Sequence, residues 1–355
     1  MDDKIERVVQ AAILAPSGDN CQPWQFTWNG RELVIAQEDS RARHALNYLN
    51  HASCVALGGV LESIQIAGAQ EGLSVTYSLS DNLKKNPGAK VQFQMASPQT
   101  PDDLYPALTL RATDRRLYQK GSLQEPLFER VKRDVFARPA CGFYWHDRFP
   151  APLVDYIAQT SCYPFEWRSA HHDLFRWIRF SDKAALRTRD GMSWRNLGGN
   201  FLEVLAVRFC KSFIIQRAAN PILFKKLMRA QSKRSVLSSA ALGLLTVKSE
   251  APEHLVEAGK IGFRIWCRLN LNGYAFQPLL SATLPSYDKR AGAPPLNPFY
   301  RDLFEKGHSI LQSVFHFSDN EIPLLLFRTG KMEPLPIKSR ALHRELSKVY
   351  KRISE

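Results

Sequence analysis

Apolar residues recur at the start of the chain first with the period of a helix and then with that of a strand. Residues 5–13 are apolar at helical spacing, and this predicts a helix that ends before Pro16. Two strand-like runs, 24–28 and 32–35, flank Asn29-Gly30. That arrangement is typical of a two-residue β-hairpin.

The later chain partly repeats a plan laid out in its first hundred residues. An apolar stripe from Leu57 to Ala67 predicts a helix that ends at Gly72 and leads into strand-like residues. The run 252–270 has the same pattern, ends at Gly273 and also leads into an apolar, strand-like run. Further strands are predicted at 75–79, 91–95, 141–145, 240–247 and 322–327, and further helices at 126–136 and 299–315.

These elements predict an α+β fold of two related halves, each with a mainly antiparallel sheet flanked by helices. The first half covers 1–100 and the second 107–331, joined by a polar, proline-bearing connector at 96–103. The tail, 332–355, places Leu342, Leu346, Val349 and Ile353 at helical spacing among basic residues. It predicts a C-terminal basic helix that docks its apolar stripe on the surface.

Charge singles out one segment of the second half. The chain has 355 residues and a net charge of +14, and residues 187–236 hold eleven Lys or Arg against Asp190 and Glu203. Apolar residues alternate with the basic ones, so one interpretation is a pair of amphipathic helices that cover the core and keep a solvated basic face. The other is an interfacial segment that makes peripheral contact with an anionic membrane. No nucleic-acid role is predicted, because the segment lacks a recognised binding motif.

The remaining composition favours a cytoplasmic protein, apart from the peripheral membrane contact that the second interpretation allows. The six cysteines are scattered without a C-x-x-C pair or metal-ligand spacing, which is typical of reduced thiols and predicts no metal site. The acidic start carries no apolar leader, and no apolar run approaches the roughly 20 residues of a spanning helix. The chain also lacks a Walker loop, G-x-G-x-x-G, G-x-S-x-G and H-E-x-x-H.

Three polar segments are candidates for chemistry. The loop Ala15–Trp24 supplies Ser17, Asn20 and Gln22 beside an aromatic residue, and such groups either form an Asx-turn or hydrogen-bond the edge of a flat polar ring. Arg111, Thr113 and Arg115 alternate along an extended segment, so their side chains share one side. They form either a solvated polar loop or two guanidinium forks and a hydroxyl that match phosphate oxygens. Arg328 and Lys331 follow a buried strand and form either a surface strand end or part of the same phosphate pocket.

Taken together, these segments resemble the nitroreductase family of flavoproteins. The loop resembles the family's A-P-S-x-x-N-x-Q-P-W motif, with Ser17, Asn20 and Gln22 at its polar positions. Arg111, Thr113 and Arg115 resemble its R-x-S-x-R motif, with Thr in place of Ser, and Arg328 with Lys331 resembles its distal basic pair. The resemblance implies that the phosphate motif and the basic pair grip the phosphate of FMN, and that the loop contacts the isoalloxazine ring.

Each half lacks the motif that the other supplies. The first has no R-x-S-x-R and the second has no A-P-S-x-x-N loop, an arrangement that resembles the single-chain subgroup typified by mycobacterial Acg. Arg189-Asp190-Gly191 also resembles that subgroup. The resemblance implies a fused pseudo-dimer with one FMN site between its halves, so that no oligomer is required.

The resemblance implies an FMN-dependent oxidoreductase that takes electrons from NADH or NADPH and passes them to a small conjugated acceptor, nitroaromatic or quinone-like. No catalytic side chain is nominated, because the flavin itself carries the electrons. The alternative is a non-catalytic protein that sequesters FMN, with residues 187–236 as a lid over the ring.

Overall fold

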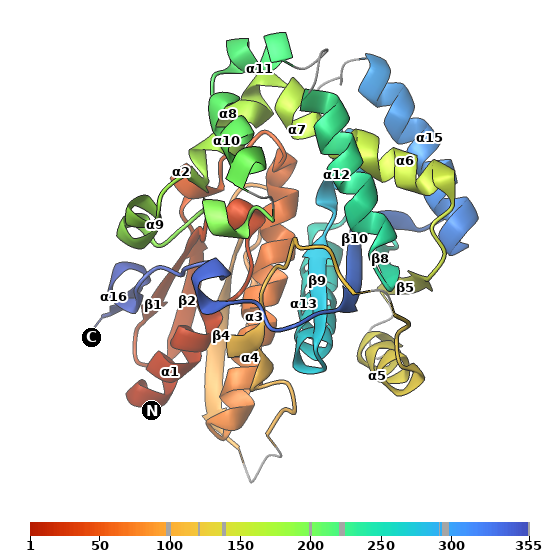
Figure 1. The fold of residues 1–355 in the computed structure, drawn as a ribbon. Coiled ribbons are helices and arrows are strands. Elements are labelled where there is room, and N and C mark those ends of the chain that lie inside the picture. The colour runs from red at the N-terminus through yellow and green to blue at the C-terminus, as the bar shows by residue number, and fades with distance from the viewer. Residues whose placement is uncertain are drawn as a thin grey trace.

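Two mainly antiparallel sheets form the framework of the molecule (Figure 1). The computed structural model describes residues 1–96, 101–119, 121–136, 140–198, 201–219, 224–290, 292 and 298–353. Residues 97–100 of the predicted connector, and Pro221 and Leu223 of the basic segment, lie outside the described residues. The predicted α+β class with antiparallel sheets and flanking helices is confirmed.

The first sheet has the strand order β11-β1-β2-β4-β3. Its strands are β1 (Trp24–Trp28), β2 (Glu32–Gln37), β3 (Leu73–Leu79), β4 (Gly88–Met95) and β11 (Tyr350–Arg352). The predicted hairpin between β1 and β2 is confirmed: Gly30 has a φ of 87°, and Asn29 Oδ1 accepts hydrogen bonds from the N–H groups of Arg31 and Glu32. The turn thus uses the conformation that glycine adopts without strain.

The second sheet has the strand order β5-β8-β10-β9. Its strands are β5 (Cys141–His146), β8 (Ala241–Val247), β9 (Tyr274–Pro278) and β10 (Ile322–Lys331). The two central strands, β8 and β10, are buried almost throughout, which explains why their sequences are continuous apolar runs and do not alternate.

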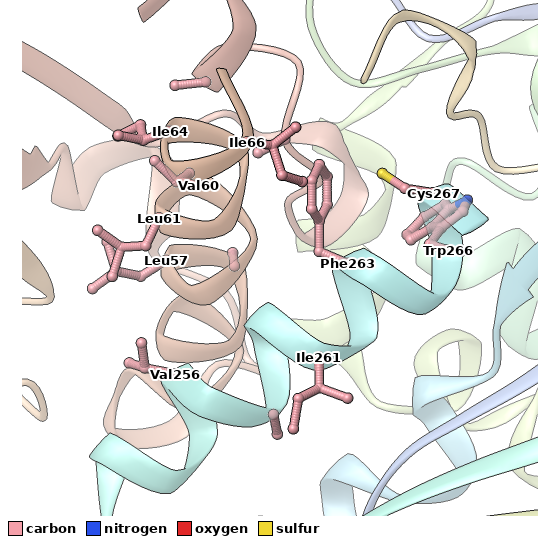
Figure 2. Close-up of a cluster of buried hydrophobic side chains, with 14 of the residues drawn as sticks. Leu57, Val60, Leu61, Ile64, Ile66, Val256, Ile261, Phe263, Trp266 and Cys267 are labelled. Carbon is pink, nitrogen blue, oxygen red and sulfur yellow. The ribbon is translucent and has the colours of Figure 1, made fainter. Parts of the chain in front are cut away.

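Two long helices, α3 (His51–Gln70) and α13 (Pro252–Leu271), cross at close range between the sheets (Figure 2). Their contact is reciprocal. A Cβ on Gly58 would lie 2.1 Å from Val256 O, and a Cβ on Gly259 would lie 2.0 Å from Val55 O. Each helix has 20 residues and is followed by a glycine of positive φ and then by a strand.

The remaining helices surround this framework. They are α1 (Asp2–Ala12), α2 (Asp39–Ala42), α4 (Ala107–Leu110), α5 (Glu125–Phe136), α6 (Ala151–Thr160), α7 (Tyr163–Glu166), α8 (Arg168–Arg176), α9 (Asp182–Thr188), α10 (Phe201–Phe209), α11 (Phe213–Ala219), α12 (Lys225–Leu237), α14 (Leu284–Arg290), α15 (Pro298–Phe315) and α16 (Leu346–Val349). A two-stranded ribbon, β6 (Ile178–Arg179) with β7 (Met192–Ser193), precedes α10. Figure 1 shows α8, α10, α11 and α12 together in the upper part of the view.

The predicted C-terminal helix over 332–355 is wrong. Within the described residues 332–353, the only helical segments are the short Ile337–Ser339 and Leu346–Val349, and Tyr350–Arg352 pairs in parallel with Phe26–Trp28. The strand satisfies backbone groups on the free edge of β1, a gain that an isolated surface helix does not offer. Helical spacing in this segment therefore marks no helix face: Val349 is buried and Ile353 is exposed.

Among the described residues, one helical stretch, Tyr48–Gln70, has the length and apolar composition to cross a membrane. It contains α3, and 78% of its most apolar window is buried inside the protein, as expected of a core helix. All six cysteines are buried free thiols. A cytoplasmic location stays a prediction.

Candidate functional site

A cavity of about 690 Å³ lies beside the crossing of α3 and α13. Its walls come from the loop after α1, from α3, from α13 and from the segment that follows α4. Strand β9 and the helices α10 and α12 complete it. Cofactor and ligand sites commonly have volumes of about 300–1,000 Å³.

The loop at residues 16–23 reaches the cavity in a strained conformation. Asp19, Asn20 and Gln22 have φ values of 48°, 56° and 49°, in the left-handed region that non-glycine residues rarely adopt. Ser17 Oγ accepts a hydrogen bond of 2.8 Å from the backbone N–H of Gln22 and holds the turn. Residues in such conformations persist only where surrounding contacts hold them, and they cluster at functional sites.

The two side-chain amides of this loop bind distant backbone. Asn20 Nδ2 donates to Gly191 O and Leu342 O, at 3.0 and 2.9 Å. Gln22 Nε2 donates to Arg189 O, and its Oε1 accepts from the N–H of Arg344. Asn20 lines the cavity, whereas Gln22 is buried behind the wall. Both amides therefore tie the loop to the segment before α10 and to the C-terminal segment.

Arg111, Thr113 and Arg115 all line the cavity from one extended segment. Thr113 forms a parallel bridge with Phe276 of β9, which fixes the segment along the sheet edge. Arg111 Nη2 donates to Leu14 O at 2.6 Å, and its guanidinium lies 4.6 Å from the ring centroid of Trp266. No group among the described residues accepts a hydrogen bond from its Nε. Burial lowers the pKa of Arg111 to about 10.

Arg115 adds a second cation to the same wall. Its Nη1 donates to Asn196 O at 3.0 Å, and burial lowers its pKa. Within the described ranges, no carboxylate lies at ion-pair distance from Arg111 or Arg115. Buried charges are normally paired, so this wall is suited to an anionic group of a ligand.

Arg328 and Lys331 do not line the cavity. Arg328 is fully buried and donates to Ser235 O, Arg116 O and Gln277 Oε1, at 2.9, 2.7 and 2.6 Å. It thus holds α12 and the residue after Arg115 against the second sheet. Lys331 is exposed at the end of β10. The structure therefore brings Ser17, Asn20, Arg111, Thr113 and Arg115 to one cavity and places Gln22, Arg328 and Lys331 outside its lining.

Two histidines at the cavity were not predicted. His44 Nε2 lies 3.2 Å from Asp19 Oδ2; burial opposes its protonation, but this carboxylate outweighs that effect and raises its pKa. His343 lines the cavity with an unpartnered Nδ1. Burial and the charges of Arg111 and Arg189 lower the pKa of His343 to about 4. No short-range pattern marks either residue, because each reaches the cavity only through the folding of distant segments.

The basic segment 187–236 forms the roof of the cavity. Val204 and Val207 of α10, with Leu227 and Met228 of α12, line it from above. Ion pairs from Lys225 to Glu166 of α7 and from Lys233 to Asp155 of α6 hold α12 in place. These four apolar side chains therefore cover the cavity.

Asp190, at the start of the basic segment, joins it to α2 and to β6. Its carboxylate pairs with Arg41 of α2 and with Arg179 of β6. Burial opposes ionisation, but hydrogen bonds from these partners lower the pKa of Asp190. The next residue, Gly191, donates its N–H to Asn20 O at 3.0 Å. Arg189-Asp190-Gly191 is therefore a junction between the roof and the loop at 16–23.

No protein-family profile matches the chain. A curated relative, uncharacterized protein MT1398 of Mycobacterium tuberculosis, is 22% identical over 276 residues, which are 77% of this chain. The aligned part spans only 38% of that relative's length.

The chain is also similar to solved structures described as nitroreductases. One, from Anabaena variabilis ATCC 29413 and provisionally so described, is 9% identical, covers 93% of this chain and 88% of its own, and has a TM-score of 0.47. A nitroreductase with bound FMN from Desulfitobacterium hafniense DCB-2 is 9% identical and has a TM-score of 0.35. The match covers 69% of this chain and 100% of that structure. The FMN-dependent nitroreductase NfnB from Mycobacterium smegmatis, in complex with NADPH, is 13% identical and has a TM-score of 0.37. The match covers 71% of this chain and 100% of that structure. All three scores lie below 0.5, so the function proposed for this chain rests on its own residues.

Proposed function

We propose that this protein is an FMN-dependent NAD(P)H oxidoreductase of the nitroreductase type, with its flavin in the cavity between the halves. The observation that carries the proposal is the pair Arg111 and Arg115, two cations on a cavity wall with no carboxylate partner among the described residues. The two lie beside a loop that matches the family's ring-binding motif. A phosphate that ends a flat ring system has the complementary charge and shape.

The residues present fit FMN. The guanidinium groups of Arg111 and Arg115 line the cavity and have N–H groups beyond those that donate to Leu14 O, Asn196 O and Met192 Sδ, so they would hold phosphate oxygens. Thr113 lies between them in the sequence and lines the same cavity. Ser17 and Asn20 line the wall where the ring edge would lie. When bound, FMN supplies hydride chemistry; the side chains hold it, orient it and exclude water. A binding role for Gln22, Arg328 and Lys331 stays a prediction.

The pseudo-dimer is part of the proposal. Its support is the reciprocal contact of Gly58 and Gly259, and the equal lengths of the two helices that carry them. One half supplies the loop with Ser17 and Asn20, and the other supplies Arg111 and Arg115. A single cavity of this kind gives one flavin per chain and needs no second copy.

The decisive experiment follows the flavin absorbance of purified protein. We expect yellow protein whose absorbance near the flavin maximum bleaches when NADH or NADPH is added without oxygen, and returns when a quinone or nitroaromatic compound follows. Colourless protein that takes up no added FMN contradicts the proposal.

A second candidate function is FMN sequestration without turnover. The roof formed by α10 and α12 favours it, because a closed roof over the ring would keep a nicotinamide from stacking. Under this alternative the protein is yellow, but neither NADH nor NADPH bleaches it, whereas dithionite does. The same titration therefore separates the two functions.

A further inference from the structure

Helix α10 is apolar on two opposite faces. Val204 and Val207 line the cavity, whereas Leu202 and Phe209 are 72% and 66% exposed on the outside. The next helix, α11, adds Ile214, which is 81% exposed. Surface helices normally expose a polar face, so a helix that is apolar on both sides indicates that something covers its outer face.

Basic residues lie beside these apolar side chains in a stretch of sequence that is poor in carboxylates. From Val204 to Val236 the chain contains no Asp or Glu. Arg208, Lys211 and Arg217 are exposed, and no carboxylate in the described part of the chain lies at ion-pair distance from them. Arg208, Phe209 and Lys211 also line a shallow surface hollow. Positive charge and a bulky apolar side chain therefore share this hollow, and the other exposed apolar side chains lie on the same two consecutive helices, α10 and α11.

We propose that this surface docks on an anionic lipid bilayer. We call it the docking surface, and it consists of Leu202, Arg208, Phe209, Lys211, Ile214 and Arg217. Aliphatic and aromatic side chains insert at the boundary between headgroups and acyl chains, while the neighbouring cations pair with lipid phosphates. Nucleic acid would use the cations but would leave Leu202 and Ile214 exposed to water, so the lipid surface is favoured.

The docking surface lies on the roof of the cavity. Leu227 of α12 lines the cavity and is also 48% exposed, so the cavity reaches the protein surface at α12, which forms the roof together with α10. This part of the inference rests on the proposed function: the acceptor is a bilayer-dissolved quinone. NAD(P)H and a proton reduce it to the quinol and leave NAD(P)⁺, so electrons and protons balance.

Co-sedimentation of the full chain with vesicles tests the docking surface. We expect binding to vesicles of phosphatidylcholine mixed with phosphatidylglycerol, and little binding to phosphatidylcholine alone. Each basic residue near an anionic surface changes partitioning about fivefold, so Arg208→Gln, Lys211→Gln and Arg217→Gln together should weaken binding about 100-fold. The matched control replaces exposed Lys84, Lys85 and Lys306 with Gln and should bind almost as the parent does.

The apolar contribution has its own variants. Phe209→Ser with Ile214→Ser should abolish most vesicle binding, whereas Leu186→Ser with Ile337→Ser, at positions 61% and 85% exposed elsewhere, should not. Equal, negligible sedimentation with both kinds of vesicle overturns the proposal. So does unchanged binding by the docking variants, and so does binding to duplex DNA in place of vesicles.

The acceptor class is tested separately. With NADH or NADPH, the docking variants should slow reduction of a long-chain quinone in anionic vesicles and leave reduction of a water-soluble, short-chain quinone unchanged. Equal effects on both quinones overturn the acceptor class. Because vesicle binding is measured without a reductant, colourless protein that still binds anionic vesicles contradicts the flavin proposal alone.

Discussion

At the scale of single residues, the cavity is defined by charges without counter-ions. Arg111 contacts a carbonyl and the faces of aromatic rings, and Arg115 contacts a carbonyl and Met192 Sδ, but neither meets a carboxylate among the described residues. Holding two such cations in a partly desolvated wall costs folding free energy. A bound phosphate would offset that cost. Replacing these residues should therefore change flavin affinity more than it changes the free energy of unfolding.

Replacing both Arg111 and Arg115 with Ala should therefore release the flavin. Each charge-assisted hydrogen bond contributes about 1.5–3 kcal/mol, so FMN affinity should fall about 10²- to 10⁴-fold. Fluorescence titration of apoprotein with FMN measures the loss. Lys132→Ala with Arg133→Ala on α5 is the control, and undiminished affinity in the Arg111/Arg115 variant would refute the phosphate assignment.

His343 predicts a dependence of stability on pH. Its pKa is about 4 in the folded protein, against about 6.5 for an ordinary histidine. Between about pH 4 and pH 6.5, the unfolded chain binds a proton at this histidine that the folded chain does not bind. The contribution of neutral His343 to the free energy of unfolding is therefore complete above about pH 6.5 and is lost as the pH falls toward 4. Urea unfolding at several pH values measures how steeply the free energy of unfolding falls as the pH is lowered, and this slope should be smaller in His343→Gln. The exposed His172→Gln control should retain the slope of the parent protein.

At the scale of elements, the crossing of α3 and α13 brings the two helices into backbone contact. Helices approach this closely only where each has a residue without a side chain at the contact. Gly58 and Gly259 are those residues. The crossing places Phe263 and Trp266 of α13 on the cavity wall near Gly59 of α3. A change in this distance would therefore alter the site as well as the core.

Gly58→Ala tests the crossing against helix propensity. Helix propensity alone predicts that Ala raises the free energy of unfolding by about 1 kcal/mol. The new methyl group, however, would lie 2.1 Å from Val256 O, and a backbone oxygen cannot move aside as a flexible side chain can. We expect a loss of about 1–3 kcal/mol in the free energy of unfolding. Gly59→Ala, one residue on, meets only ordinary contacts at 3.5 Å and should be neutral or stabilising. Equal effects at both positions would contradict this packing.

The C-terminal strand makes an opposite prediction from a C-terminal helix. On a helix, Val349 and Ile353 would share one face, so a charge at either would be equally harmful. In the structure, Val349 ends the short helix α16 and is 3% exposed, whereas Ile353 follows β11 and is 56% exposed. Val349→Asp should cost about 3–5 kcal/mol in urea unfolding, and Ile353→Asp less than about 0.5 kcal/mol. Similar losses for both would favour the helix.

At the scale of the whole molecule, the cavity takes its side chains from segments that are far apart in the chain. Ser17 and Asn20 come from the first half, Arg111 and Arg115 from the segment that opens the second, and His343 from the tail that returns to the first sheet. The buried core is likewise continuous across both sheets. We expect that neither half folds or binds FMN when expressed alone.

Stoichiometry is the measurement at this scale. The pseudo-dimer predicts one FMN per 40.4 kDa chain in a monomer. Light scattering after gel filtration gives the mass, and flavin released by heat gives the ratio. Two flavins per chain, or a flavin that is retained only in a dimer, would contradict a single site between the halves.

The sequence by itself determined the elements whose causes are local. The hairpin at Asn29-Gly30 and the helix over 252–270 follow from turn chemistry and apolar spacing within a few residues, and both are confirmed. The alternation of Arg111, Thr113 and Arg115 likewise placed all three on one wall, because an extended backbone allows no other arrangement.

Only the tertiary structure decided where side chains with several available partners point. Arg328 lies on a strand end that the sequence identified, yet it hydrogen-bonds to backbone far along the chain and not to the cavity. The tail became a strand because the free edge of β1 offered backbone partners, and only then did His343 reach the cavity. Such choices depend on contacts between residues hundreds of positions apart, which no local pattern records.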